Sequence, residues 1–330
     1  MNGTAAGGVA AALLVSALAT VALLRWQAYL PVAAVNARTL HAAPVPRVGG
    51  LAVWAGWLPV ALLTPTLPSL AGATWWIPWL ALVGVSLADD MREVPIAPRL
   101  AIHAFAAAWF ACTVVRANPD PATIALAVAY GLVAAWSLNL YNFMDGSDGL
   151  AAAMTVIGFG ACGTVLWHQG LPATMPLALA GAMLPVLVVN WPPARIFLGD
   201  VGAVPLGFLA AAIGIGGIVD GAWSWWFPVL VFLTFIADAT VTLARRALSG
   251  ERFWEGHKAH HYQRLHQLGA GHAGTLAVFG ALMLGTAGTA VACACLWPEW
   301  GAPALAAWCA VCALLFAAID YHWRRNAQRT

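Results

Sequence analysis

The sequence predicts an all-α, polytopic integral membrane protein that forms a single domain over residues 1–330. Its residues are 62% hydrophobic and only 8% charged, which a soluble domain could not tolerate. Runs of about 18 or more apolar residues recur, each long enough to cross the ~30 Å hydrocarbon layer as a helix. The polar residues are gathered in short loops between these runs, so the loops are where chemistry is expected.

Length and apolarity predict about ten or eleven membrane-spanning helices. Their limits are 8–26, 48–64, 74–88, 99–116, 122–138, 149–167, 172–190, 201–219, 222–243, 272–297 and 301–321. The first run lacks a basic region before it and is followed by Arg25, so it is expected to be a retained anchor and not a cleaved signal peptide.

The basic residues predict the orientation. Every Lys and Arg except Arg116 falls in alternate loops or in the C-terminal tail. The positive-inside rule therefore places the N-terminus outside and the C-terminus in the cytoplasm. Tryptophan clusters near residues 75–79, 223–226 and 297–300 then fall near the outer interface, where amphipathic rings are favoured.

The segment 139–150, NLYNFMDGSDGL, is the most polar junction between two apolar runs. It carries Asn142 and two carboxylates, Asp145 and Asp148, each followed by a glycine that permits a tight turn. A polar turn between helices is the alternative, since Asp-Gly is common turn chemistry. Acids at the membrane boundary of so apolar a chain favour a functional role.

Two earlier loops have a related character. The segment 36–50 places His41 and Arg47 near a glycine pair, which suits phosphate binding or an ordinary basic loop beside the membrane. The next loop begins with Asp89 and Asp90. Adjacent carboxylates repel each other, so this pair indicates a divalent metal site or a base with a shifted pKa, unless Arg92 simply neutralises it.

Two later loops complete the set. In 190–202, NWPPARIFLGDVG, Asp200 lies where the next span begins and could cap that helix or hold Mg²⁺ over a phosphate. In the segment 251–267, His257, His260 and His261 would share one face if the segment is helical. A zinc site fits the spacing, but the neighbouring Lys and Arg favour an anion; a surface helix is the alternative.

Together, these five loops predict phosphoryl chemistry on the cytoplasmic face. Carboxylates would hold a divalent cation that bridges phosphate oxygens, and basic side chains would bind the remaining oxygens. A secondary transporter is a second possibility, for which Asp238 inside the ninth span could serve, although transporter sites lie near the midplane. A membrane prenyltransferase is a third, but the acids lack its usual spacing.

The chain resembles the bacterial polyprenyl-phosphate N-acetylhexosamine-1-phosphate transferases. The matching strings are HAAPVPRVGG, LADD, NLYNFMDGSDGL, NWPPARIFLGD followed by VGAVPLG, and HKAHHYQRL, in the family's order. Val45, Val48 and Ala203 depart from the family pattern and put a hydroxyl contact in doubt. The ending HxxHHYQRL resembles the O-antigen branch more than the muramoyl-pentapeptide branch. His266 falls outside this string and is the expected neutral control.

The resemblance implies transfer of a sugar 1-phosphate from a UDP-N-acetylhexosamine to polyprenyl phosphate, with release of UMP. It implies Mg²⁺, with Mn²⁺ as a substitute, in the bacterial inner membrane. The lipid bilayer is a partner, nucleic acid is not, and a homodimer stays open. By position, the resemblance assigns Asp200, with Asp89, to the metal, and Asp89 and Asp90 to the lipid phosphate or the metal. It places Asn142, Asp145 and Asp148 near the nucleotide, with Phe197 at the uracil. It places Asn190, His257, His260 and His261 at the diphosphate.

Overall fold

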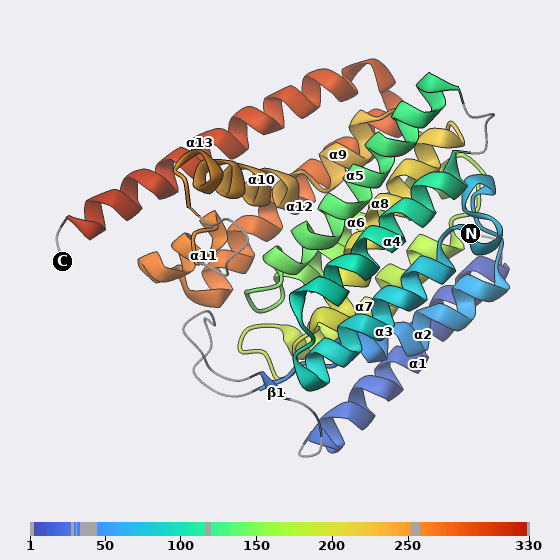
Figure 1. The fold of residues 1–330 in the computed structure, drawn as a ribbon, viewed down its shortest axis with the longest axis horizontal. Coiled ribbons are helices and arrows are strands. Elements are labelled where there is room, and N and C mark those ends of the chain that lie inside the picture. The colour runs from blue at the N-terminus through green and yellow to red at the C-terminus, as the bar shows by residue number, and fades with distance from the viewer. Residues whose placement is uncertain are drawn as a thin grey trace.

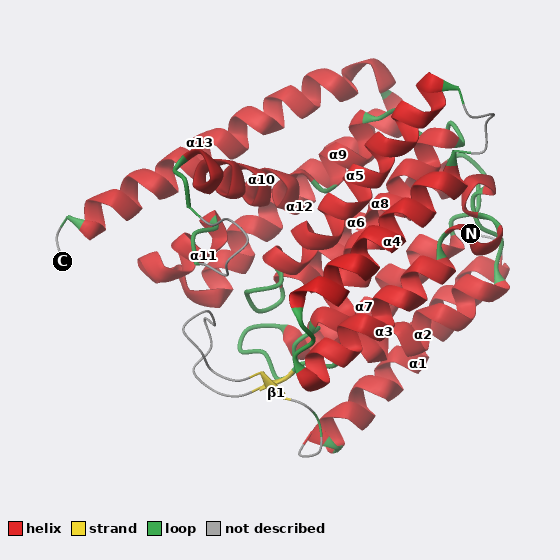
Figure 2. Cartoon of the chain, viewed as in Figure 1, coloured by secondary structure: helices red, strands yellow, loops and turns green. Residues whose placement is uncertain are grey.

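The described part of the computed structural model comprises residues 3–27, 30, 32–33, 45–115, 120–251 and 258–328. It is almost entirely helical, with one short antiparallel strand pair (Figure 2). The predicted site residues His41 and His257, and also Arg116, lie outside the described residues.

The elements follow one another in a simple order. They are α1 (Gly3–Arg25), β1 (Val32–Ala33), β2 (Val45–Pro46), α2 (Gly49–Leu63), η2 (Pro68–Leu70), η3 (Gly72–Thr74), α3 (Trp76–Arg92), α4 (Ile96–Val114), α5 (Pro121–Met144), α6 (Leu150–His168), α7 (Thr174–Asn190), α8 (Asp200–Val219), α9 (Trp226–Val231), α10 (Leu233–Leu248), α11 (His261–Leu265), the π-helical turn η4 (His266–Ala270), α12 (Gly271–Leu296), η5 (Pro298–Trp300) and α13 (Gly301–Ala327).

The prediction of an all-α, multi-span membrane protein is confirmed. Within the described ranges, seven helices are long and apolar enough to cross a membrane, and α2 and α7 are shorter apolar helices. Each predicted span coincides with a helix or, for the ninth, with a pair of helices. Apolar length alone was therefore enough to locate the helices.

The ninth span is broken, which corrects the expectation of one helix over 222–243. The break falls at Phe232, between α9 and α10, where the backbone leaves helical geometry (φ −98°, ψ 12°). The ring of Phe232 is buried against Tyr141 of α5 and Phe159 of α6, which anchors the break between two other helices. α10 then continues to Leu248.

α8 is the central helix, buried along nearly its whole length. Small residues let its neighbours approach closely: a Cβ on Gly207 would meet the Ser137 carbonyl oxygen of α5 at 2.3 Å. A Cβ on Gly50 of α2 would meet the Gly202 Cα at 2.4 Å. Close backbone packing through glycine is typical of helices in a bilayer, where lipid supplies no hydrophobic drive between helices.

The tryptophans near residues 75–79 are not a simple interfacial belt. Trp75 and Trp79 are buried and pack edge-on or tilted against Trp54 and Trp57 of α2, with ring centroids 5.2–5.6 Å apart in the cross-helix pairs. Packing between α2 and α3 therefore encloses these two rings, and their position near the outer interface stays a prediction. Trp297 and Trp300 are exposed.

The polar loops meet at one end of the bundle. Figure 1 shows the strand pair, the loops after α5 and α7, and α11 at one end, with the C-terminus on that side and the N-terminus on the other. Segments as far apart in the sequence as β2 and α11 are thereby brought to a single surface.

Candidate active site

Asp90, in the last turn of α3, holds the beginning of α8. Its two carboxylate oxygens accept hydrogen bonds from the backbone N–H groups of Asp200 (3.2 Å) and Val201 (2.9 Å). The first N–H groups of a helix have no partner within the helix, so Asp90 acts as a cap supplied by a different helix. Arg47 Nε lies 3.4 Å from the same carboxylate.

Asp89 and Asp200 share a guanidinium. Arg99 Nη1 lies 2.5 Å from Asp89 Oδ2, and Arg99 Nη2 lies 3.4 Å from Asp200 Oδ2. The other Asp89 oxygen accepts from the Val94 N–H at 2.8 Å. The acid pair is thus balanced by Arg99 and Arg47 and not by the sequence neighbour Arg92.

The segment before α2 runs alongside the segment before α8. Phe197 N–H donates to the Pro46 carbonyl oxygen at 2.8 Å, and the N–H groups of Gly49 and Gly50 donate to the carbonyls of Phe197 (2.8 Å) and Leu198 (3.0 Å). These bonds set Arg47 beside the start of α8. Gly199 is required here: its φ is +72°, and a Cβ would meet the Arg47 carbonyl oxygen at 2.1 Å.

Asn190 joins the two most distinctive motifs. Its Oδ1 accepts from the Gly149 N–H at 2.9 Å, and its Nδ2 donates to the Ile196 carbonyl at 2.8 Å. Nearby, Asp148 Oδ2 accepts from the Ala194 N–H at 3.0 Å. Both side chains are buried, at 3% exposure each, so the structure shows them holding the α5–α6 loop against the α7–α8 loop.

Asn142 and Asp145 end α5 and are partly exposed at the same surface. Burial raises the pKa of the Asp145 carboxyl well above its usual value, the nearby charges of Asp200 and Asp90 raise it further, and Arg47 lowers it. Carboxylates from α3, α5 and α8 therefore lie close enough to repel one another.

This crowding bears on the expected magnesium ion. Four carboxylates, Asp89, Asp90, Asp145 and Asp200, gather around two guanidiniums, and all their donor atoms are the hard oxygens that Mg²⁺ prefers. Among the described residues no three acidic, His or Cys side chains form a complete metal site. Mg²⁺ commonly takes one or two carboxylates and completes its shell with water and substrate phosphates, so the donor set fits.

The histidine segment, residues 260–264, is held by Asp238 of α10. The Asp238 carboxylate accepts from the N–H groups of His261 (2.8 Å) and Tyr262 (3.0 Å), and His261 Nδ1 lies 2.9 Å away. α11 begins at His261, and His260 precedes it with extended geometry (φ −59°, ψ 148°). The expected helical face of three histidines is therefore not formed, because the helix starts too late.

This arrangement also accounts for Asp238. Both of its oxygens bind backbone N–H groups of α11, so this buried acid serves as a cap and does not stand free in the span. It offers no support for an ion-carrying role. His260 lies against Phe143, with ring centroids 6.1 Å apart, next to Asn142 in α5.

Sequence reasoning missed two residues that support the motif 139–150. His272 Nδ1 lies 3.0 Å from Ser147 Oγ and 3.3 Å from the Asp148 N–H. The Tyr262 hydroxyl donates to the Phe143 carbonyl at 3.0 Å, and a Cβ on Gly146 would meet that hydroxyl at 2.1 Å. The GxG before His272, a sharp turn at a helix start, is the signal that could have indicated it.

His266 is not a remote position. Its ring lies 4.3 Å, centroid to centroid, from the ring of His272, which in turn contacts Ser147 and Asp148. It is therefore a poor neutral control for the histidine segment, and an exposed histidine elsewhere in the chain is needed instead.

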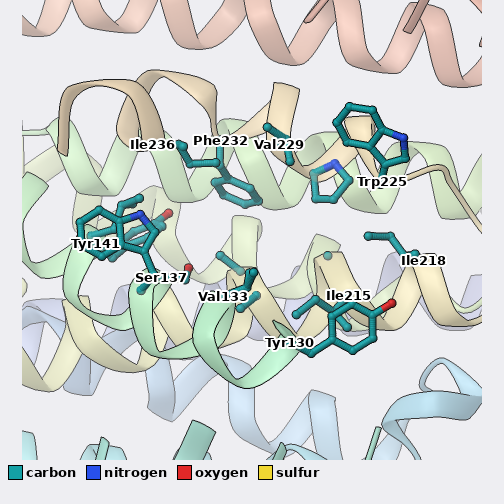
Figure 3. A pocket seen from close by; sticks show the side chains of 16 residues that line it. Tyr130, Val133, Ser137, Tyr141, Ile215, Ile218, Trp225, Val229, Phe232 and Ile236 are labelled. Carbon is teal, nitrogen blue, oxygen red and sulfur yellow. The ribbon is translucent and has the colours of Figure 1, made fainter. Parts of the chain in front are cut away.

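An apolar groove leads away from this surface along the bundle. It has a volume of about 370 Å³ and lies between α5, α8 and the broken ninth span (Figure 3). Tyr141 and Ile236 line one end of the groove, while Tyr130, Ile218 and Trp225 line the other. Tyr141 directly precedes Asn142, so the first end of the groove lies near the end of α5 that carries the motif 139–150.

Known proteins match a large part of this chain. The family model "Glycosyl transferase family 4" matches residues 73–218. A candidate glycosyltransferase of Streptomyces coelicolor is 34% identical over 261 residues, which are 73% of this chain and 59% of the relative. The chain thus spans little more than half the length of this relative.

Two further relatives carry more specific names. Decaprenyl-phosphate N-acetylglucosaminephosphotransferase of Mycobacterium tuberculosis is 27% identical over 284 residues, 71% of this chain and 69% of the relative. Phospho-N-acetylmuramoyl-pentapeptide-transferase of Enterococcus hirae is 32% identical over 143 residues, 42% of this chain and 44% of the relative. The matches include relatives named for two different sugars. Together, these matches make the chain similar to glycosyl transferase family 4 over residues 73–218 and to a polyprenyl-phosphate sugar-phosphate transferase over 71% of its length.

Proposed function

We propose that the protein transfers an N-acetylhexosamine 1-phosphate from a UDP-sugar to polyprenyl phosphate. An oxygen of the lipid phosphate forms a bond to the β-phosphorus, the bond from that phosphorus to the bridging oxygen breaks, and the electron pair leaves with UMP. The products are polyprenyl diphosphate-sugar and UMP. This activity agrees with the name of the Mycobacterium relative, a decaprenyl-phosphate N-acetylglucosaminephosphotransferase.

The observation that carries this proposal is the junction of a charged surface with an apolar groove. Carboxylates and guanidiniums from the segments around Arg47, Asp90, Asp145 and Asp200 form the charged surface. The groove of Figure 3 has one end at Tyr141, near the end of α5, and is lined almost wholly by apolar side chains. A substrate with a phosphate head and an isoprenoid chain has the matching division between polar and apolar parts.

Each set of side chains has a distinct task in this reaction. Arg47 and Arg99 are about one-third exposed, at 36% and 30%, so they can bind phosphate oxygens while remaining near their carboxylates. The resemblance assigns Asp200 and Asp89 to the metal, but the Asp89 oxygens contact Arg99 and the Val94 N–H, so we place Asp145 beside Asp200 as the residues that would hold Mg²⁺. When bound, the ion offsets the charge of both phosphorylated substrates and lowers the barrier to their approach.

The remaining groups act by holding positions. Asp90, Asn190 and Asp148 tie the loops together through buried hydrogen bonds, so the phosphate-binding groups are fixed before substrate arrives. Positioning and fixed charge are the main contributions a protein makes to phosphoryl transfer. We place Phe197, which is partly exposed between these loops, at the uracil, and His260 at the diphosphate.

We further propose that this surface faces the cytoplasm of a bacterial inner membrane, with the C-terminus on the same side. The basic loops and the C-terminus share one end of the bundle, which supports that orientation (Figure 1). The form of the histidine string supports a product used in O-antigen or a related surface polysaccharide.

The test is release of UMP from UDP-N-acetylhexosamine by the purified protein with polyprenyl phosphate in detergent. One phosphoanhydride is broken and one is made, so the reaction is close to balanced and should also run backwards. Labelled UMP should enter UDP-sugar when the lipid product is present. Exchange without any lipid would indicate a covalent sugar-phosphate enzyme instead. No release and no exchange with any UDP-sugar would refute the proposal.

A further inference from the structure

We propose that Asp320, in the last helix α13, is a positioning residue that holds the histidine segment 260–264 in the active site. This inference rests on the proposed transferase function for its effect on turnover. Its effect on the segment itself is independent of any activity. Neither the motifs of the sequence nor the matched region 73–218 includes this residue.

Asp320 is a buried acid on the inward face of α13, near the exposed C-terminal end of that helix. Its exposure is 8%, whereas the next residue, Tyr321, is 61% exposed and His322 is also exposed. Much of α13 faces outward, as Figure 1 shows for its long C-terminal part. A carboxylate turned inward at such a position has to be paired, because an unpaired buried charge is strongly unfavourable.

Its partners come from two different elements. Asp320 Oδ1 lies 2.6 Å from Arg264 Nη1 of α11, and Asp320 Oδ2 lies 2.6 Å from Arg245 Nη2 of α10. The Asp320 carboxylate therefore links α13 to both α10 and α11. Each oxygen forms a short, charge-assisted contact, which is the stronger class of hydrogen bond.

Asp320 also completes a second contact, to the ring of His261. His261 Nε2 lies 3.6 Å from Asp320 Oδ1, and its Nδ1 lies 2.9 Å from Asp238 Oδ1. The fully buried ring is stacked on Phe316 of α13, with centroids 4.0 Å apart and planes 9° apart. The ring is thus enclosed between carboxylates of α10 and α13, and its orientation depends on both.

The opposite side of the segment meets the catalytic loops. His260 lies against Phe143, and the Tyr262 hydroxyl donates to the Phe143 carbonyl, beside the motif that carries Asn142 and Asp145. A shift of α11 would therefore move His260 and the end of α5 together. Misplacement of catalytic groups by about 1 Å can lower a rate by about 10²-fold.

Asp320→Asn removes the charge and leaves Arg264 and Arg245 without their carboxylate. We expect kcat to fall about tenfold or more, with little change in KM for polyprenyl phosphate, because the groove is not touched. Asp320→Glu, which keeps the charge, should retain more activity. Arg325→Gln, an exposed change further along the same helix, is the matched control and should behave as the wild type.

A double-mutant cycle separates positioning from general support of the fold. If Asp320 acts through the segment that carries His260, Asp320→Asn should reduce kcat much less in a His260→Ala background than in the wild type. Fully additive losses would overturn the inference, and so would wild-type kcat in Asp320→Asn.

Hydrogen exchange supplies a test that needs no activity. The amides of His261 and Tyr262 donate to Asp238, so they should be protected in the wild type and exchange faster in Asp320→Asn, while α8 stays unchanged. Unchanged exchange of these amides would refute the inference. Absence of UMP release from the wild type, with faster exchange in the variant, would refute the proposed function alone.

Discussion

Asn190→Ala tests whether the two central loops are held together as the structure indicates. The substitution removes the acceptor for the Gly149 N–H and the donor to the Ile196 carbonyl, both of which are buried. A buried polar group left without a partner costs about 1–3 kcal/mol, so two such groups give a loss of about 2–6 kcal/mol. The two Asn190 hydrogen bonds also position the loop that carries Asp145 and Asp148, so turnover should fall by about 10²-fold.

The assay is thermal melting in detergent together with UMP release per folded molecule. We expect the melting temperature to fall by several degrees. We also expect kcat to be low at temperatures well below the melting temperature of the variant. Asn139→Ala is the matched control for stability, because the Asn139 amide donates to the Ala135 carbonyl of its own helix, at 2.8 Å, and makes no other side-chain hydrogen bond within the described part of the chain. Its stability should change by no more than about 0.5 kcal/mol. Wild-type melting and turnover in Asn190→Ala would show that the clamp has no role.

Four further predictions concern metal, histidine, lipid and topology. Asp200→Asn should lose activity by a factor of at least about 10² while the protein still inserts and melts normally, and chelation should abolish wild-type activity; full activity in excess chelator would remove the metal from the mechanism. His260→Ala should lower turnover more than His322→Ala, a change at an exposed residue. Equal effects would indicate that the histidine segment is a surface helix with no part in the reaction. Val133→Trp, in the groove, should raise KM for a long-chain polyprenyl phosphate and leave KM for the UDP-sugar unchanged; an unchanged KM for the lipid would place the lipid elsewhere. A reporter after Thr330 should be cytoplasmic and one at 117–121 external, because of the basic residues near the loops.

The helices could be read from the chain because a bilayer imposes one requirement on every span. Each crossing needs about 20 apolar residues with all backbone groups paired internally, so apolar length is nearly sufficient evidence of a helix. The break at Phe232 escaped this reasoning. At the break, Phe232 packs against Tyr141 and Phe159 of two other helices, and such contacts between helices cannot be inferred from the apolarity of one segment.

The site was predicted in part, for a similar reason. Acids and glycines stand out in so apolar a chain, so the loops with Asp90, Asp145 and Asp200 could be identified from sequence. The partner of each carboxylate could not be identified from the sequence. Asp90 was expected to bind a metal or lipid phosphate, and it also caps α8, a contact between residues 110 positions apart.

The sequence by itself determined that this chain is a helical membrane protein with its polar residues in a few loops. The reason is that the free-energy cost of placing polar groups in lipid applies to each segment separately. Only the tertiary structure decided how those loops serve one another. Asn190 became a clamp, Asp238 a helix cap, and Asp320, His272 and Tyr262 supports of the site. Those roles depend on distances of a few ångströms between distant helices, and such distances are set by packing and not by local composition.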